Sequence, residues 1–369
     1  MMKNNYRILT ISAFSAVLAV FMLAHIILPD KKISESERRS LAVFPELSAK
    51  SVLSGKFTEN LEKYLADQFP GREGFRFIAS ASELIRGRAD VNGVYSSGGY
   101  LSKLDPEFSS DSVRANMRKL EHAVLILSGG GNNGYFALIP PKEYYFGENV
   151  HPQYDFDALC ETCRNASALG SIELTDVLEL ESYYSSDSHW RQEKIVPVCE
   201  RIVRGMGFNY SPPAFGTVDV GLFRGVYAGQ SGVWLTEEVL SYLYWDGCDS
   251  VLVTSLEGNA DRLYTVEKYE TSIDKYDIFL GGAVSFLTVE NQNAINDAHI
   301  ILIRDSFGSS LTPLLASQFR KITVIDLRYI SLEYAKKYLE EDTSPDAVLV
   351  MLSPGTVKTG GSLKIKEIK

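Results

Sequence analysis

The last quarter of the chain constrains the fold most strongly, because short apolar runs alternate there with helical patterns. The pattern predicts strands and helices in alternation, at residues 299–304, 309–319, 322–327, 332–341 and 347–352. Each predicted strand is an almost continuous apolar run, as expected of strands covered on both faces of a sheet. Strand–helix–strand connections of this kind join parallel strands through right-handed crossovers. The sequence therefore predicts an α/β fold around a parallel sheet.

The preceding part of the chain predicts further elements that extend this α/β body. Helices are predicted where apolar residues recur at helical spacing, at 57–69, 75–85 and 112–127. Short strands and one buried strand are predicted at 91–95, 97–101 and 135–139. Runs rich in tyrosine, phenylalanine and valine predict β-rich insertions at 221–227, 251–256 and 263–269.

An apolar run near the N-terminus predicts a membrane anchor. Residues 8–28 contain no Asp, Glu, Lys or Arg, and Lys3 and Arg7 precede them as a cytoplasmic flank. At 1.5 Å per residue, a helix of this length crosses a bilayer of about 30 Å. No cleavage site with small residues follows the run, so we predict an uncleaved signal anchor. The alternative is a signal peptide that is removed late.

This anchor divides the chain into four predicted segments of a single-pass membrane protein. Residues 1–7 form a cytoplasmic tail, 8–28 the transmembrane signal anchor, 29–56 a juxtamembrane stalk and 57–369 an extracytoplasmic catalytic domain. A net charge of −10 and the lack of a basic cluster exclude nucleic acid as a partner, because phosphate binding needs concentrated Lys and Arg.

The four cysteines include one pair, Cys160 and Cys163, at CxxC spacing. Such a pair can form a local disulfide, a redox centre or half of a zinc site. No second pair completes a zinc site, so we predict no metal and no cofactor, and an incidental pair that can oxidise outside the cytoplasm.

Ser306 stands where a predicted strand ends and a helix begins. This edge of an open α/β sheet is where ligands bind, and free N–H groups at a helix start can stabilise an oxyanion. Gly308 lets the backbone pack closely in the turn. The alternative is that Asp305 or Ser306 only caps the helix, since both are favoured N-cap residues.

His189 is the one histidine of the five that combines a loop setting with a carboxylate two residues away, Asp187. Both side chains can point into a cleft from an extended loop, and together with Ser306 they supply a base, an orienting carboxylate and a nucleophile. The alternative is that Asp187 or Ser188 caps a helix over 190–206.

With these residues, the sequence resembles the DHHW family of bacterial extracytoplasmic proteins, which is grouped with the SGNH-hydrolase-like domains of alginate O-acetyltransferases. The signature is Asp187-Ser188-His189-Trp190. Other matching segments lie on both sides of it, at 33–41, 64–72, 91–95, 279–282, 305–307 and 326–329.

The resemblance implies a circularly permuted, three-layer α/β/α domain of SGNH-hydrolase type. It also implies that Asp187 and His189 are the acid and base and that Ser306 is the nucleophile. The backbone of Gly281 and Gly282 would provide an oxyanion hole together with the N–H of Ser306.

Two positions depart from the family pattern. Ser188 stands where a second histidine is usual, between the two residues expected to be catalytic. Ala283 follows the glycine pair where the family often has asparagine, a possible oxyanion donor whose loss could cost roughly 10²-fold in rate.

The implied function is O-acyl transfer, most simply acetylation of an exported polysaccharide or cell-wall glycan. A membrane-bound O-acyltransferase partner would deliver the acyl group, and Trp190, Arg328 and Tyr329 are the candidates for binding substrate. Three alternatives remain open: a glycan esterase with the same triad, a glycan-binding protein with a decayed site, and a structural scaffold.

Overall fold

The computed structural model describes residues 2–105, 107–147, 155–233, 237–258, 260–339, 344–360 and 363–366. The chain divides into two compact units. The first takes in residues 1–92 and 228–235, and the second takes in 93–227 and 236–369.

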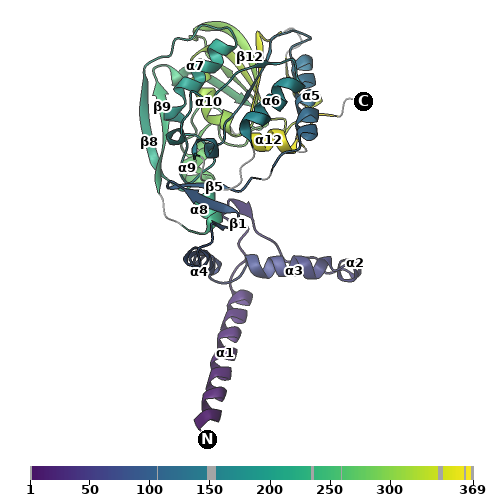
Figure 1. Cartoon of the computed structure of the whole chain (residues 1–369), viewed down its shortest axis with the longest axis vertical. Helices are drawn as coiled ribbons and strands as arrows, with labels where there is room; N and C mark the ends of the chain where they lie inside the picture. The colour runs from purple at the N-terminus through teal and green to yellow at the C-terminus, as the bar shows by residue number, and fades with distance from the viewer. Residues whose placement is uncertain are drawn as a thin grey trace. The chain divides into compact units, whose positions relative to one another are not determined.

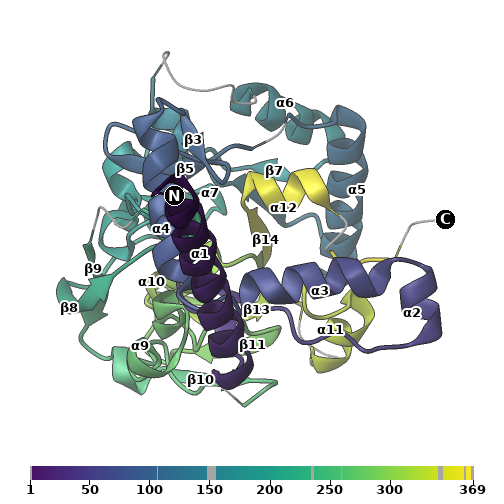
Figure 2. The same cartoon turned by 90° about the horizontal axis from the view of Figure 1, so that it is seen from below.

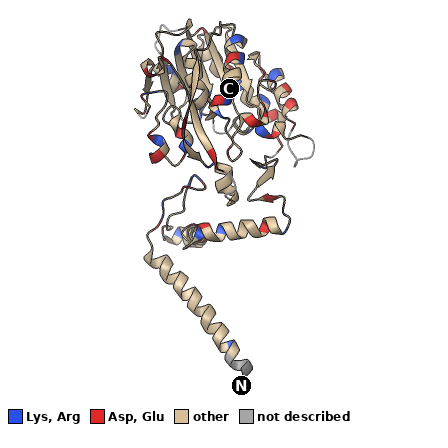
Figure 3. Ribbon diagram, turned by 90° about the vertical axis from the view of Figure 1, so that its left-hand side faces the viewer, with Lys and Arg blue, Asp and Glu red and all other residues tan. Residues whose placement is uncertain are grey.

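The first unit begins with the long apolar helix α1 (Met2–Ile27), which carries hardly any charge along its length (Figure 3). Among the described residues it is the one helix long and apolar enough to cross a membrane, over Tyr6–Ile27. A two-stranded sheet and three more helices follow. Their bounds are β1 (Ile33–Ser34), β2 (Arg39–Ser40), α2 (Ala49–Leu53), α3 (Lys56–Asp67) and α4 (Arg72–Ile85), with β3 (Asp90–Val91) ending the segment.

The second unit is built on a mixed sheet, as the sequence predicts for an α/β protein (Figure 1). Over the described residues its seven strands lie in the order β10-β11-β13-β12-β14-β6-β7. From β13 to β7 the pairs are parallel, whereas β11 is antiparallel to both of its neighbours. The bounds are β6 (Gly134–Leu138), β7 (Gly170–Ser171), β10 (Leu252–Ser255), β11 (Phe286–Glu290), β12 (Asn296–Arg304), β13 (Phe319–Ile325) and β14 (Ala347–Leu352).

Side chains of this sheet alternate between two buried clusters, as the two-residue period of a strand requires. In β14, Leu349 and Met351 belong to one cluster, and Val348 and Val350 belong to the other. The first cluster includes α7 (Val196–Gly205) and α10 (Phe307–Ala316). The second includes α5 (Ser110–Leu127), α6 (Phe156–Ala166), α11 (Leu332–Tyr338) and α12 (Pro354–Thr359), of which α5, α6 and α12 lie together in Figure 2.

The remaining elements of the second unit surround the sheet. A hairpin joins β4 (Val94–Ser97) to β5 (Tyr100–Lys103), and a longer one joins β8 (Phe215–Phe223) to β9 (Glu238–Trp245). The short helices are α8 (Val226–Ser231) and α9 (Lys268–Thr271), with 3₁₀ turns η1 (Lys142–Tyr145), η2 (Leu180–Ser182), η3 (Gln192–Lys194), η4 (Cys248–Ser250) and η5 (Lys275–Ile278).

Several predicted elements differ from those observed. The run 221–227 is divided between the end of β8 and the start of α8, and 251–256 supplies β10 of the main sheet rather than an insertion. The run 263–269 is not a strand: Leu263 and Tyr264 are buried in a loop where Tyr264 makes one isolated bridge to Phe279, and residues 268 and 269 begin α9. The helix predicted at 332–341 ends at Tyr338, and its residues 340 and 341 lie outside the described residues.

We predict that the intact protein stays in the membrane fraction after a carbonate wash at high pH, because an apolar helix of this length is held by the bilayer core. Protease added outside the cell should reach most of the chain. A mature N-terminus near residue 30, found by mass spectrometry, would contradict the anchor and indicate a cleaved signal peptide.

Candidate active site

Ser306 lies at the carboxyl end of a central strand. β12 ends at Arg304, and α10 begins at Phe307. β12 pairs in parallel with strands on both sides, so the turn after it opens at the edge of the sheet where ligands bind. The turn is tight: a Cβ added at Gly308 would lie 2.6 Å from Cβ of Arg304. The close packing predicted for Gly308 is therefore observed.

The side chain of Asp305, and not that of Ser306, caps the N-terminus of α10. Its Oδ1 accepts a hydrogen bond from the N–H of Phe307 at 3.2 Å, and its Oδ2 accepts one from the N–H of Ser353 at 2.7 Å. The Ser306 side chain makes no capping hydrogen bond. The Ser306 hydroxyl is thus available for another partner.

That partner is His189, whose Nε2 lies 2.8 Å from the Ser306 hydroxyl. The other ring nitrogen, Nδ1, lies 2.7 Å from Oδ1 of Asp187. A carboxylate can only accept, so Nδ1 carries the ring proton and Nε2 is left to accept from the serine. The structure therefore brings together the three residues that the sequence singles out, in the order of a nucleophile, a base and an orienting acid.

Asp187 is completely buried, and hydrogen bonds compensate the cost of burying its charge. Besides the His189 ring, it accepts from the N–H of His189 at 3.1 Å and from the N–H of Val226 at 2.8 Å. The adjoining Gly225 packs against the same loop, where an added Cβ would lie 2.1 Å from the carbonyl oxygen of Ser186. Neither Asp187 nor Ser188 caps a helix over 190–206, because the first turn there is η3 and α7 starts at Val196.

Trp190 ties the histidine loop to α10 a second time. Its Nε1–H donates to the hydroxyl of Ser310 at 2.8 Å, and Ser310 lies one helical turn beyond Ser306. The indole is completely buried, so the expectation that Trp190 contacts substrate is not met, since no face of the ring is accessible. The phenol of Tyr276 stacks on the His189 ring at 4.2 Å and bonds the same Ser310 hydroxyl at 2.7 Å.

Lys142, which the sequence pattern does not single out, holds the loop that carries Asp187 and His189 by hydrogen bonds. Its Nζ donates to the carbonyl oxygens of Asp187, Tyr184 and Ser185 at 2.7, 3.1 and 3.2 Å. An ammonium has three donors, so this arrangement uses all of them. Burial lowers the pKa of Lys142 from 10.5 to about 8, while the nearby carboxylates of Glu143, Asp187 and Glu238 act to raise it.

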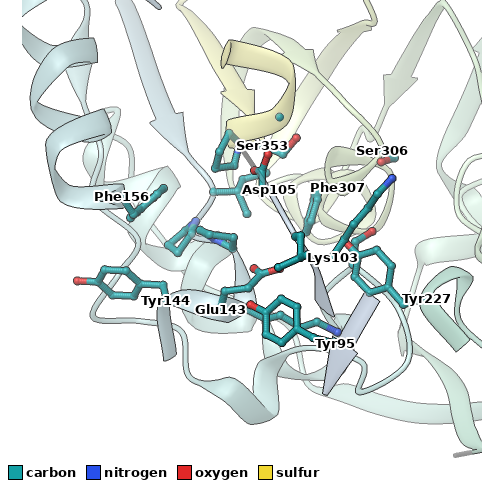
Figure 4. Close-up of a pocket in the computed structure, with 18 residues that line it drawn as sticks. Tyr95, Lys103, Asp105, Glu143, Tyr144, Phe156, Tyr227, Ser306, Phe307 and Ser353 are labelled. Atoms are coloured by element: carbon teal, nitrogen blue, oxygen red, sulfur yellow. The ribbon is translucent and has the colours of Figure 1, made fainter. Parts of the chain in front are cut away.

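A cavity of about 490 Å³ opens beside Ser306. Figure 4 shows Ser306 and Tyr227 on one side of it, Tyr144 and Phe156 on the other, and Glu143 between them. Burial and the neighbouring Asp105 raise the pKa of Glu143, partly offset by its own backbone N–H and by Lys142 and Lys358. The cavity thus joins aromatic rings to a few polar groups, as small-ligand sites commonly do.

Ser188, the first departure from the family pattern, lines this cavity, while its neighbours Asp187 and His189 form the hydrogen-bonded pair. Ser306 lines it as well, but the residues predicted for the oxyanion hole on the glycine pair, Gly281 and Gly282, do not. The N–H of Gly282 donates to the carbonyl of Phe279 at 3.1 Å, so the oxyanion role expected of Gly282 is not available. Gly281 and the exposed Ala283 also lie outside the lining. Of the three residues predicted for the oxyanion hole, Ser306 is the one that lines the cavity.

Arg328 and Tyr329 also lie outside the lining residues of the cavity. The Arg328 guanidinium pairs with Asp326 through two hydrogen bonds of 2.9 and 2.7 Å and lies over the Tyr329 ring. The expectation that these two residues bind substrate beside Ser306 is therefore not supported, because the arginine is committed to a neighbouring carboxylate.

The four cysteines are free thiols, and burial raises the pKa of Cys160 and of Cys163 to about 12. Within the described part of the chain, no group of three or more His, Cys, Asp or Glu side chains is arranged to hold a metal ion.

Comparisons with solved structures show the fold. A DHHW family protein from Eubacterium siraeum matches 76% of this chain and 97% of its own at 14% identity, with a TM-score of 0.61. Bacillus cereus PatB1, solved with a sulfonyl adduct, matches 74% of this chain and 98% of its own at 18% identity, with a TM-score of 0.58. The O-acetyltransferase domain of Pseudomonas putida AlgJ matches 72% and 92% at 14% identity, with a TM-score of 0.44.

No protein-family model and no curated protein sequence matches the chain. The structural neighbours nevertheless include a DHHW family protein, and the chain has a mixed α/β fold similar to theirs.

We predict that Lys142→Met changes the pH dependence of stability. The pKa of Lys142 in the folded protein, about 8, lies below its ordinary value of 10.5, so the unfolded chain binds more protons between these pH values. The contribution of Lys142 to the free energy of unfolding therefore rises from pH 8 to 10.5, by about 3 kcal/mol at about 1.4 kcal/mol per pH unit.

Urea titrations at several pH values measure this effect as the difference between the wild type and Lys142→Met. The difference should grow with pH, whereas Lys103→Met, which removes an exposed lysine of the same cavity, should leave the pH dependence unchanged. Parallel curves for wild type and Lys142→Met would show that the buried amine does not titrate in this window.

Proposed function

We propose that the protein is a membrane-anchored O-acyltransferase, in which Ser306 carries the acyl group from a donor to a hydroxyl of an exported polysaccharide or cell-wall glycan. The observation that carries this proposal is the hydrogen-bonded series Asp187–His189–Ser306, with links of 2.7 and 2.8 Å, at the wall of a cavity. Serine, histidine and aspartate in this order are the machinery of acyl transfer.

In the first half-reaction, the Ser306 hydroxyl oxygen attacks the carbonyl carbon of the acyl donor while Nε2 of His189 takes its proton. The N–H of Ser306 would donate a hydrogen bond to the oxyanion that develops on the acyl group. The imidazolium returns the proton to the leaving group, and the acyl group remains on the serine. Asp187 holds the ring in the tautomer that this step needs and stabilises its charge.

In the second half-reaction, a glycan hydroxyl gives its proton to Nε2 of His189 and attacks the acyl carbon. The ester bond to Ser306 breaks, the serine recovers the proton, and the acylated glycan leaves. Transfer requires that the glycan hydroxyl displace water from the site. The cavity volume of about 490 Å³ lies within the usual range for small-ligand sites, and the rings of Tyr144 and Tyr227 offer faces for a sugar.

The glycan esterase remains the second candidate, because water can replace the glycan hydroxyl in the same sequence of steps. A decayed, binding-only site has less support. In the sequence, the support for a decayed site is Ala283, which stands where the family often has asparagine. Ala283 is exposed and lies outside the cavity lining. The triad hydrogen bonds do not depend on it.

The wider setting belongs to the same proposal. Residues 1–7 would be cytoplasmic, 8–28 would span the membrane, and 29–56 would form a juxtamembrane stalk for the exported catalytic part, 57–369. That part would be a three-layer, circularly permuted SGNH-type domain. A membrane-bound acyltransferase would supply the acyl group from the cytoplasm.

We predict that Ser306→Ala and His189→Ala each lower the turnover of an acetylated chromogenic ester by about 10³-fold or more, and that the double variant is little worse. The residues act as one unit, so either loss disables the same step. Asp187→Ala should cost somewhat less, because the ring keeps its base function. Ser353→Ala, which alters another serine of the cavity, is the matched control and should retain turnover.

Product analysis with oligosaccharide acceptors separates the two candidates. Acetylated oligosaccharide indicates transfer, and free acetate alone indicates an esterase. Undiminished ester turnover in Ser306→Ala, or glycan binding by a wild type that turns over no ester, would overturn the proposed chemistry.

A further inference from the structure

Helix α4 in the first unit is amphipathic, but its apolar side is exposed and its polar side faces the protein, the reverse of a surface helix in a water-soluble protein. Its apolar side chains are exposed, including Ile78 at 64% and Ile85 at 87%. At 100° per residue, the exposed apolar positions cover about half of the helix circumference. They are Phe75, Phe77, Ile78, Leu84 and Ile85.

The polar half of α4 contacts the rest of the first unit. Arg76 donates to the carbonyl oxygens of Gly229 and Gln230 at 3.0 and 3.1 Å, and Arg72 bonds Glu37 at 2.5 Å. Ser80 is buried. A surface helix in water turns its apolar side toward the protein, so this inverted arrangement calls for an apolar medium outside.

The same surface continues beyond α4. The segment before α3, α3 itself and the turn after it also expose large apolar side chains. They are more numerous than the scattered single apolar residues of an ordinary soluble surface. They are Val43, Phe44, Leu47, Val52, Leu53, Leu65 and Phe69. We call residues 43–85 the platform.

Contacts with α1 set the level of the platform relative to the predicted membrane span. The ring of Phe21 stacks on Phe69 at 5.2 Å and meets Phe75 edge-on at 5.8 Å. Phe21 lies six residues before Ile27, the end of the apolar span, which is about 9 Å along a helix. If α1 crosses the bilayer, Phe69 and Phe75 therefore lie within its outer apolar region.

The direction of the helices and the pairing of charges agree with that level. Figure 1 shows α3 running across the direction of α1, as a helix in the plane of a membrane surface would. Charged groups at the junction of α3 and α4 are paired, Asp67 with Arg39 at 2.6 Å and Arg72 with Glu37 at 2.5 Å. Pairing lowers the cost of bringing them to the headgroup region.

We propose that the platform lies in the outer leaflet of the lipid bilayer beside α1, with the apolar half of α4 in contact with acyl chains. The proposal rests on the anchor described under the proposed function. Surface helices of this type bury their apolar side about 5–10 Å into a membrane, which matches the level set by Phe21. The platform and α1 would then hold the first unit to the membrane at two places.

The test uses the full chain in liposomes of phosphatidylcholine, with and without bromine on the acyl chains, which quenches nearby tryptophan. Tryptophan is introduced singly at Ile78 and at Ile85 in the platform, at Phe14 in α1 and at Leu125 in α5 of the second unit. Emission is compared with that of the parent chain, which has three tryptophans. All four positions are exposed, so each substitution should be tolerated.

We expect brominated lipid to reduce the added emission of Ile78→Trp and Ile85→Trp about as strongly as that of Phe14→Trp, and to leave Leu125→Trp unchanged. Platform tryptophans that respond instead to acrylamide in water would overturn the proposal. So would tryptophans that respond to neither quencher, which would indicate a protein surface as the occupant. Lack of quenching at Phe14→Trp would count against the anchor itself, a separate failure.

Discussion

The hydrogen bond between His189 and Ser306 joins two segments 117 residues apart, and much of the second unit is arranged to hold it. On the serine side, a parallel central strand and the capping by Asp305 fix the start of α10. On the histidine side, the loop is extended and has little secondary structure of its own. Hydrogen bonds fix its position: the Lys142 ammonium donates to the carbonyl oxygen of Asp187, and the Trp190 indole donates to the hydroxyl of Ser310.

Burial is what makes this arrangement specific. Asp187 and Lys142 would each be costly to bury alone, but Lys142 donates to carbonyl oxygens of the loop that carries Asp187, and each has hydrogen-bond partners for its charge. A loop shifted out of place would leave several of these groups unpaired at once. The serine and histidine are therefore held in position before any substrate arrives, which is the condition for efficient acyl transfer.

The parts that could be predicted from the sequence are those with local signals. The alternating apolar runs predicted the parallel strands. The sequence around Ser306 and His189 predicted that Ser306, His189 and Asp187 lie together. The role of Lys142 could not be predicted from the sequence. A single lysine after two prolines is no recognisable motif, and its three carbonyl partners are more than 40 residues away in the chain. The roles predicted for Gly282 and Trp190 do not fit their surroundings: the N–H of Gly282 is used in a local turn with Phe279, and tertiary packing buries Trp190 completely.

The assignment of Ser306 as the nucleophile is tested most directly by looking for the acyl-enzyme. The protein is mixed briefly with an acetylated chromogenic ester, quenched in acid, digested and examined by mass spectrometry. The assignment predicts a peptide heavier by one acetyl group, with the group located on Ser306, and its absence from His189→Ala treated in the same way. An acetyl group found on another residue, or equal labelling of Ser306 in the His189→Ala variant, would contradict it.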